Sequence, residues 1–182
     1  MTGDTSSMEH ASPVAIEEMS LNAWPALKTV VHKGCLLRSS DGYTNRANSA
    51  NPLYSDAADI RDIVEYAEGF YASERLAPVF KILGIPDYET LDAELASRGY
   101  GKITETTVML AELPEADIRT TGVTIRDSFD EDWITACATF NGYSASIRET
   151  LSRILAAVRV EKIVASVVID GTVAACGYGA LE

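Results

Sequence analysis

The N-terminal third of the sequence predicts a helix followed by extended segments. Ser12 can cap a helix that has Pro13 at its first position, and apolar residues then recur at helical spacing, at Ile16, Met19 and Ala23. Two strand-like runs follow, over residues 29–40 and 43–53. Between them stands Asp41-Gly42, a dipeptide typical of a two-residue hairpin turn. We therefore predict a helix and a hairpin centred on this dipeptide.

The middle of the chain predicts two helices and two strands. A helix beginning near Asp56 has one apolar face, formed by Ile60, Ile63, Val64, Ala67 and Tyr71. A strand is predicted over residues 79–83, and a helix with Leu91 and Leu95 ends at Gly99. Residues 102–113 alternate with period two, which predicts a long strand.

The C-terminal third predicts strand, two helices and a second hairpin. A strand is expected over residues 123–126, and Ser128 with Glu131 resembles a capping box for the first helix. The two helices have apolar stripes formed by Trp133, Ile134, Cys137 and Phe140, and by Ile147, Leu151, Ile154, Leu155 and Val158. Strands over residues 162–169 and 172–180 flank Asp170-Gly171. Helix, strand, Asp-Gly and strand thus occur twice, which indicates an internal repeat whose second copy lacks its final part.

Polar residues crowd the run after Asp41-Gly42. Arg46, Asn48 and Ser49 lie in a predicted strand, although Asn and Ser are poor strand formers. Such a group is either a buried hydrogen-bond network or one wall of a binding site, and the sequence leaves both readings open.

Composition indicates an ordinary globular protein. Of the 182 residues, 47% are hydrophobic and 23% are charged, and the net charge is -12. An acidic surface repels a phosphate backbone, so we predict no nucleic-acid partner. No apolar run is long enough to cross a bilayer, and residues 1–13 lack an apolar signal core. We therefore expect a cytoplasmic protein without a membrane partner.

The cysteines and histidines do not predict a metal or a catalytic triad. Cys35, Cys137 and Cys176 are odd in number and widely spaced, which favours buried thiols over a disulfide framework or a zinc site. The only histidines are His10 and His32.

The chain resembles a bacterial branch of the GNAT superfamily, the acyl-CoA-dependent N-acetyltransferases. The resemblance runs from Asn22 to the C-terminus and is carried by residues 22–27, 34–38, 41–44 and 46–49. Members of this branch look like two acetyltransferase-like halves joined in tandem. The first half is usually degenerate, and the second binds acetyl-CoA. The resemblance implies an α/β fold with mixed sheets and flanking helices. It implies transfer of acetyl from acetyl-CoA to a small-molecule or peptide amine.

This resemblance divides the chain into four segments. Residues 1–12 are a flexible tail, residues 13–113 the degenerate half, residues 114–121 a linker, and residues 122–182 the start of the second half. The family's diphosphate-binding loop has the form Arg/Gln-x-x-Gly-x-Gly/Ala and precedes a helix. The first half has no glycine between residues 51 and 60, and the second half is expected to stop before the loop. We therefore expect weak or no activity from this chain alone, and we identify no residue that binds the cofactor.

Two residues near the C-terminus are candidates for catalysis by resemblance. Glu182 ends the strand that borders the acceptor cleft in relatives, so it is the candidate base, and Tyr178 is a candidate wall residue. Arg46, Asn48 and Ser49 are candidates for substrate binding. The rival hypothesis is a non-catalytic binding or assembly module, which would form homo-oligomers through unpaired sheet edges.

Overall fold

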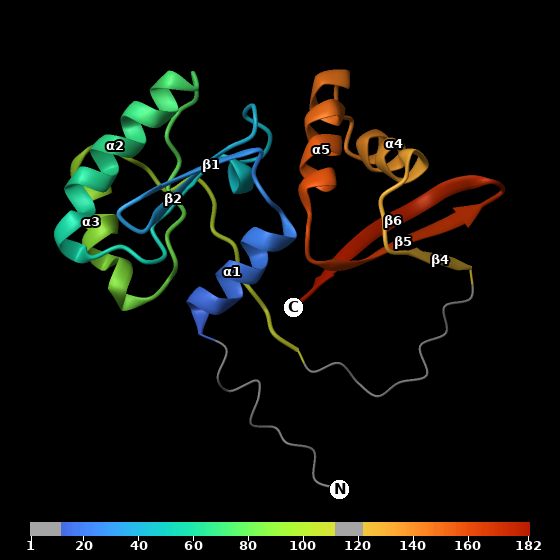
Figure 1. Cartoon of the computed structure of the whole chain (residues 1–182), viewed down its shortest axis with the longest axis horizontal. Helices are drawn as coiled ribbons and strands as arrows, with labels where there is room; N and C mark the ends of the chain where they lie inside the picture. The colour runs from blue at the N-terminus through green and yellow to red at the C-terminus, as the bar shows by residue number, and fades with distance from the viewer. Residues whose placement is uncertain (1–11, 112–121) are drawn as a thin grey trace, which may run out of the picture.

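The computed structural model describes residues 12–111 and 122–182, which form two α/β parts with one three-stranded sheet each (Figure 1). The first part, residues 12–111, contains α1 (Pro13–Ala23), β1 (Lys28–His32), β2 (Cys35–Ser39), β3 (Ala50–Asn51), α2 (Ile60–Ser73) and α3 (Glu89–Ser97). The second part, residues 122–182, contains β4 (Val123–Arg126), α4 (Glu131–Phe140), α5 (Ala145–Ala157), β5 (Glu161–Ile169) and β6 (Thr172–Leu181). This order confirms the predicted α/β class and is compatible with a GNAT-like fold.

The first hairpin is displaced from its predicted position. β1 and β2 pair in antiparallel fashion around Lys33-Gly34, whose φ angles are 45° and 76°, so the predicted strand over residues 29–40 is two strands. Asp41 and Gly42 do have positive φ, 52° and 80°. They open a loop that contains the short 3-10 helix η2 (Asn45–Ala47) before the chain returns as β3 beside β2. The predicted strand over residues 43–53 is therefore reduced to β3.

Two further predicted strands are not formed, because one segment pairs with β3 at a single residue and the other pairs with no described strand. The predicted strand over residues 79–83 is reduced to a parallel bridge between Ala50 and Phe80. Residues 102–111 form no strand, and Ile103, Val108 and Met109 are exposed, because no described strand pairs with this segment. The rest of that prediction, the linker at 114–121 and the tail up to residue 11 lie outside the described residues. The domain boundaries stay a prediction.

α1 is fixed at its start and along its buried face. Ser12 accepts a hydrogen bond from the Ala15 amide at 3.1 Å and Pro13 is the first helical residue, which confirms the predicted start. Glu17 is buried, and both of its carboxylate oxygens accept from Lys81 Nζ, at 2.6 and 2.5 Å. This ion pair ties α1 to the segment that bridges β3.

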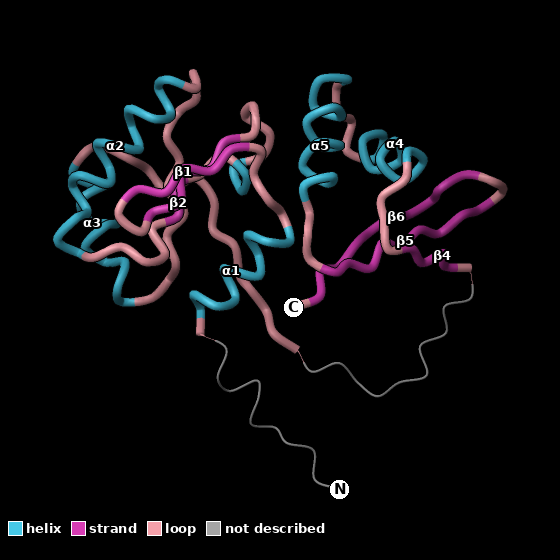
Figure 2. The backbone as a smooth tube through the Cα atoms, viewed as in Figure 1, coloured by secondary structure: helices cyan, strands magenta, loops and turns pink. Residues whose placement is uncertain are grey.

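The second part has the predicted hairpin and helices. β5 and β6 join through Asp170-Gly171, with φ angles of 50° and 76°, and β4 pairs with the other edge of β5. α4 and α5 lie over one face of this sheet (Figure 2). The cap of α4 is Asp130, which accepts from the Trp133 amide at 2.8 Å, so the prediction of Ser128 is wrong. Lys33-Gly34 and Asp170-Gly171 thus each connect two antiparallel strands, and the internal repeat predicted around Asp41-Gly42 and Asp170-Gly171 stays a prediction.

Each part has its own core, and one cluster reaches across both. The first part buries Cys35, Leu37, Ala50, Ile63, Ala67 and Tyr71, and a second cluster holds Val64, Tyr88, Leu91 and Leu95. The core of the second part contains Trp133, Ile134, Leu151, Leu155 and Val164. Trp24 and Tyr43, from the first part, pack against this last cluster. None of the described helices has the length and apolar character that a membrane span requires.

Candidate functional site

The buried guanidinium of Arg38 lies at the C-terminal end of α1, the helix end that Tyr178 of the second part also contacts. Arg38 is only 2% exposed, and its guanidinium donates to the carbonyl oxygens of Leu21 at 3.5 Å, of Trp24, and of Arg46 at 2.9 Å. The first two carbonyls are at the C-terminal end of α1, where a helix has no internal donors left. Burial lowers the pKa of Arg38 to about 10, although the charge of Glu17 opposes this shift. The arginine stays charged at neutral pH and closes the helix end.

Asn48 and Ser49 are both part of a hydrogen-bond network inside the first part. Asn48 Oδ1 accepts from the amides of Ser40 at 2.7 Å and Gly42 at 3.1 Å, and its Nδ2 donates to the Thr44 carbonyl at 2.7 Å. Ser49 is 2% exposed, and its hydroxyl accepts from Asn51 Nδ2 at 3.3 Å. These contacts hold the loop that replaces the predicted hairpin. The substrate role of both residues stays a prediction.

Tyr178 and Glu182, on β6 and just after it, contact the same end of α1 from the second part. The Tyr178 hydroxyl donates to the Ala23 carbonyl at 2.7 Å, and Glu182 Oε1 accepts from Asn22 Nδ2 at 2.8 Å. Burial raises the pKa of Tyr178 to about 12, which the nearby charge of Arg46 moderates. Tyr178 is therefore a neutral hydrogen-bond donor at neutral pH. The structure thus brings the two predicted catalytic candidates to one helix end.

Aromatic side chains fill the contact region between the two parts, which we call the junction. They are Trp24 and Tyr43 from the first part and Tyr143 and Tyr178 from the second. The ring of Tyr43 lies edge-on to that of Tyr143, with centroids 5.2 Å apart, and 6.3 Å from Trp24. The Trp24 indole donates to the Thr44 hydroxyl at 3.2 Å. Burial and the neighbouring Tyr143 hydroxyl raise the pKa of Tyr43 above its usual range. This packing keeps the junction largely apolar around the polar groups of α1.

Arg46 is the exposed member of the predicted substrate-binding set. Its carbonyl accepts from Arg38, while its side chain lies close enough to Tyr178 and Arg38 to affect the pKa of both. No ion pair of Arg46 occurs within residues 12–111 and 122–182. Its guanidinium is therefore available to a ligand that approaches the junction.

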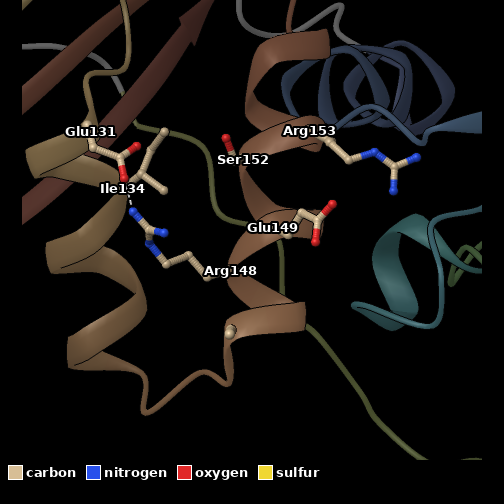
Figure 3. Close-up of a pocket in the computed structure, with 7 residues that line it drawn as sticks. Glu131, Ile134, Arg148, Glu149, Ser152 and Arg153 are labelled. Atoms are coloured by element: carbon tan, nitrogen blue, oxygen red, sulfur yellow. Dashed lines mark hydrogen bonds and ion pairs between the residues drawn. The ribbon is translucent and has the colours of Figure 1, made fainter.

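A pocket of about 400 Å³ lies between α4 and α5 (Figure 3). Glu131, Ile134, Arg148, Glu149, Ser152 and Arg153 line it, together with Ala145. Arg148 pairs with Glu131 and also donates to the Thr135 hydroxyl at 3.0 Å. Arg153 reaches across to Asp41 of the first part at 2.8 Å. The pocket therefore opens beside the junction, and its charges are mostly paired.

We expect Tyr178→Phe to weaken the junction by about 1 kcal/mol, because the change removes one hydrogen bond and leaves the Ala23 carbonyl without its donor. Urea unfolding followed by circular dichroism measures this loss. Tyr66→Phe is the matched control, since Tyr66 is an exposed tyrosine on α2. Equal stability of Tyr178→Phe and the unmodified protein would contradict the role of this bond.

Sequence reasoning missed Arg38 and Asn22 as parts of the junction. A charged residue inside the apolar run Cys35–Ser39 is a signal that could have identified Arg38, because a buried charge needs several partners. Asn22 gave no such signal, since its partner Glu182 is 160 residues away in sequence.

A family model described as "Probable histone acetyltransferase Rv0428c C-terminal" matches residues 11–180. No curated protein matches the chain, and no solved structure matches it either. The matched range includes both sheets, Arg38 and Tyr178, so the similarity extends over both parts and their junction.

Proposed function

Because the chain belongs to the family described as the C-terminal region of the probable histone acetyltransferase Rv0428c, we propose that it takes part in transferring an acetyl group from acetyl-CoA to an amine. The match over residues 11–180 is the observation that carries this proposal. A GNAT-type reaction, in which the amine attacks the thioester directly, agrees with the α/β order of elements and with the resemblance of residues 22–49.

In this proposal the reaction takes place at the C-terminal end of α1. A lysine-type ammonium has a pKa of about 10.4 in solution, so a base must take its proton before attack. Glu182 is exposed beside Asn22 and serves as that base. Tyr178 is neutral at physiological pH and can donate a proton to the departing thiolate once its hydroxyl leaves the Ala23 carbonyl.

Acceptor binding is assigned to the loop between β2 and β3. Asn48 and Ser49 shape that loop through their buried hydrogen bonds, and the exposed Arg46 contacts an acidic or polar group of the acceptor, away from the amine that reacts. The acceptor is a small-molecule or peptide amine, and the net charge of -12 favours a cationic one.

The proposed co-substrate acetyl-CoA has a diphosphate, which proteins commonly bind at a helix N-terminus. The helix starts described here are poor sites for it. Side-chain oxygens of Ser12, Asp130 and Ser144 already accept from the amide of the third helical residue of α1, α4 and α5, respectively. Acidic residues in the first turns of α2 and α3, such as Asp62 and Glu89, repel phosphate. We therefore propose that residues 12–111 and 122–182 supply the acceptor side and bind acetyl-CoA weakly.

The test is transfer of isotope-labelled acetyl from millimolar acetyl-CoA to a panel of amines, including lysine-rich peptides and polyamines, followed by mass spectrometry. We expect slow transfer to at least one cationic amine. Glu182→Gln should lower the rate about 100-fold, the usual effect of losing a general base. Glu161→Gln is the matched control, because Glu161 is an exposed glutamate on β5 opposite Leu181. Transfer equal to the protein-free rate with every amine would contradict the proposal.

A specific observation also favours the rival function, a non-catalytic binding module that self-associates. Ile125, Ile163 and Leu181 are exposed on the second sheet. β6 pairs with β5 on one side and with no other described strand on its second side. Such an edge can pair with the same edge of another copy. Sedimentation velocity separates the two functions, since a monomer at all concentrations counts against the module.

A further inference from the structure

Polar contacts, more than apolar packing, hold α1 in place. Only Glu17 and Leu21 of its 11 residues are buried. Within the described part of the chain, no residue of α1 belongs to any of the three hydrophobic clusters, whereas all four buried residues of α2 do. Segments with few buried apolar contacts open locally at a lower free energy than the rest of a fold. We therefore expect α1 to undock more readily than α2.

One ion pair carries much of this docking. The Glu17 carboxylate is buried, and both of its oxygens accept from Lys81 Nζ, at 2.6 and 2.5 Å. Removing one partner of a buried ion pair is strongly destabilising, because the other charge stays buried without compensation. Loss of the Lys81 ammonium would therefore favour the state in which α1 is undocked and Glu17 is in water.

The C-terminal end of α1 engages both groups that the proposed reaction uses (Figure 1). The Tyr178 hydroxyl donates its proton to the Ala23 carbonyl at 2.7 Å, so it cannot give that proton to a thiolate at the same time. Glu182 Oε1 accepts from the Asn22 amide at 2.8 Å, so this oxygen is not free to accept from an amine. The docked helix thus holds both groups out of the reaction.

We propose that α1 is an autoinhibitory helix, which must undock from Tyr178 and Glu182 before acetyl transfer occurs. This inference rests on the proposed function, because the helix regulates the same two residues. The observed rate is then the rate of the undocked form multiplied by the fraction of molecules in that form. A change that raises this fraction without altering Tyr178 or Glu182 raises the rate by the same factor.

The junction keeps most of its contacts when α1 undocks. Trp24, the residue after α1, packs against the core of the second part, and its indole donates to the Thr44 hydroxyl at 3.2 Å. Arg38 loses only the Leu21 carbonyl, at 3.5 Å, and keeps its other two acceptors. Rotation about the backbone torsions of Ala23 turns its carbonyl away from the second part. α1 can therefore open while both parts stay folded.

The first measurement is amide hydrogen exchange of the full chain, read by mass spectrometry on peptides from α1, residues 13–23, and from α2, residues 60–73. In the unmodified protein, the protection factors of α1 should be at least about 10-fold lower than those of α2. α2 is the internal reference because its apolar face lies in the core of the first part.

The second measurement compares exchange with the rate of isotope-labelled acetyl transfer in a variant. Lys81→Met should lower the protection of α1 by at least about 10-fold, raise the transfer rate by the same factor and leave α2 unchanged. Lys28→Met is the matched control, because its ion pair, with Glu74 at 2.7 Å, lies outside α1. This control should change neither the exchange of α1 nor the transfer rate.

Two outcomes would overturn the inference and leave the proposed function in place. One is equal protection of α1 and α2 in the unmodified protein, and the other is faster exchange of α1 in Lys81→Met with no rise in transfer. Transfer at the protein-free rate by both proteins would instead overturn the proposed function, and this inference with it. The first outcome is read from the unmodified protein, so the inference stays falsifiable even where Lys81→Met does not fold.

Discussion

Arg38→Met should lower the free energy of unfolding by about 3 kcal/mol, because each buried carbonyl that loses its donor costs about 1–3 kcal/mol. The guanidinium serves three such carbonyls, of Leu21, Trp24 and Arg46, and methionine can bond to none of them. The side chain is 2% exposed, so water cannot replace the lost bonds without opening the junction. Urea unfolding of both proteins measures the difference.

Two variants isolate the cause of that loss. Arg46→Met removes an exposed guanidinium from the loop that follows β2 and should change stability by less than about 0.5 kcal/mol. Arg38→Lys keeps the charge but cannot span three acceptors, so it should recover only part of the stability. If Arg38→Met unfolds at the same urea concentration as the unmodified protein, the carbonyls do not depend on Arg38.

Gly34→Ala should cost at least about 2 kcal/mol, the second large effect that we expect. Gly34 has a φ of 76°, a conformation that strains any residue with a Cβ atom. A Cβ added here would also overlap the Tyr54 carbonyl group, 2.5 Å from its carbon atom. The Tyr54 amide donates to the Gly34 carbonyl at 3.2 Å, so the two segments cannot separate without losing that bond.

Gly171→Ala is the matched control for Gly34→Ala. Gly171 occupies the equivalent turn of the second hairpin with the same φ of 76°, but a Cβ there would meet no atom within 4 Å. Its substitution should therefore cost only the backbone strain, about 1 kcal/mol. Thermal unfolding of both variants measures the contrast, and equal midpoints would show that the approach to Tyr54 has no energetic effect.

Local signals predicted the helices well and the first hairpin badly. Ser12 and Pro13 start α1, and Asp170-Gly171 forms the second hairpin, because both depend on the residues themselves. Asp41-Gly42 carries the same turn signal as Asp170-Gly171 and has the same backbone conformation, yet no strand of matching length follows it. Turn chemistry predicts backbone angles, whereas pairing depends on segments that are distant in sequence.

The strand predicted over residues 102–113 is absent from residues 102–111 for the same reason. The pattern that predicted it is local, whereas a strand needs a neighbour to accept its hydrogen bonds. Residues 102–111 have no such neighbour among the described strands.

The candidate site was predictable in its residues more than in its arrangement. The sequence points to Arg46, Asn48 and Ser49 because polar residues are unusual in a strand, and the structure accounts for Asn48 and Ser49 through buried hydrogen bonds. Only the resemblance points to Tyr178 and Glu182. That both meet the end of α1 depends on contacts across more than 150 residues, and no local pattern encodes such contacts.

We propose that the described residues supply the acceptor side of an acetyltransferase and bind acetyl-CoA only weakly. Isothermal titration of the folded chain with acetyl-CoA measures this affinity. The capped and acidic helix starts predict a dissociation constant weaker than about 0.1 mM. Binding with a micromolar dissociation constant would contradict the claim, because it would require a diphosphate site that the described helices do not offer.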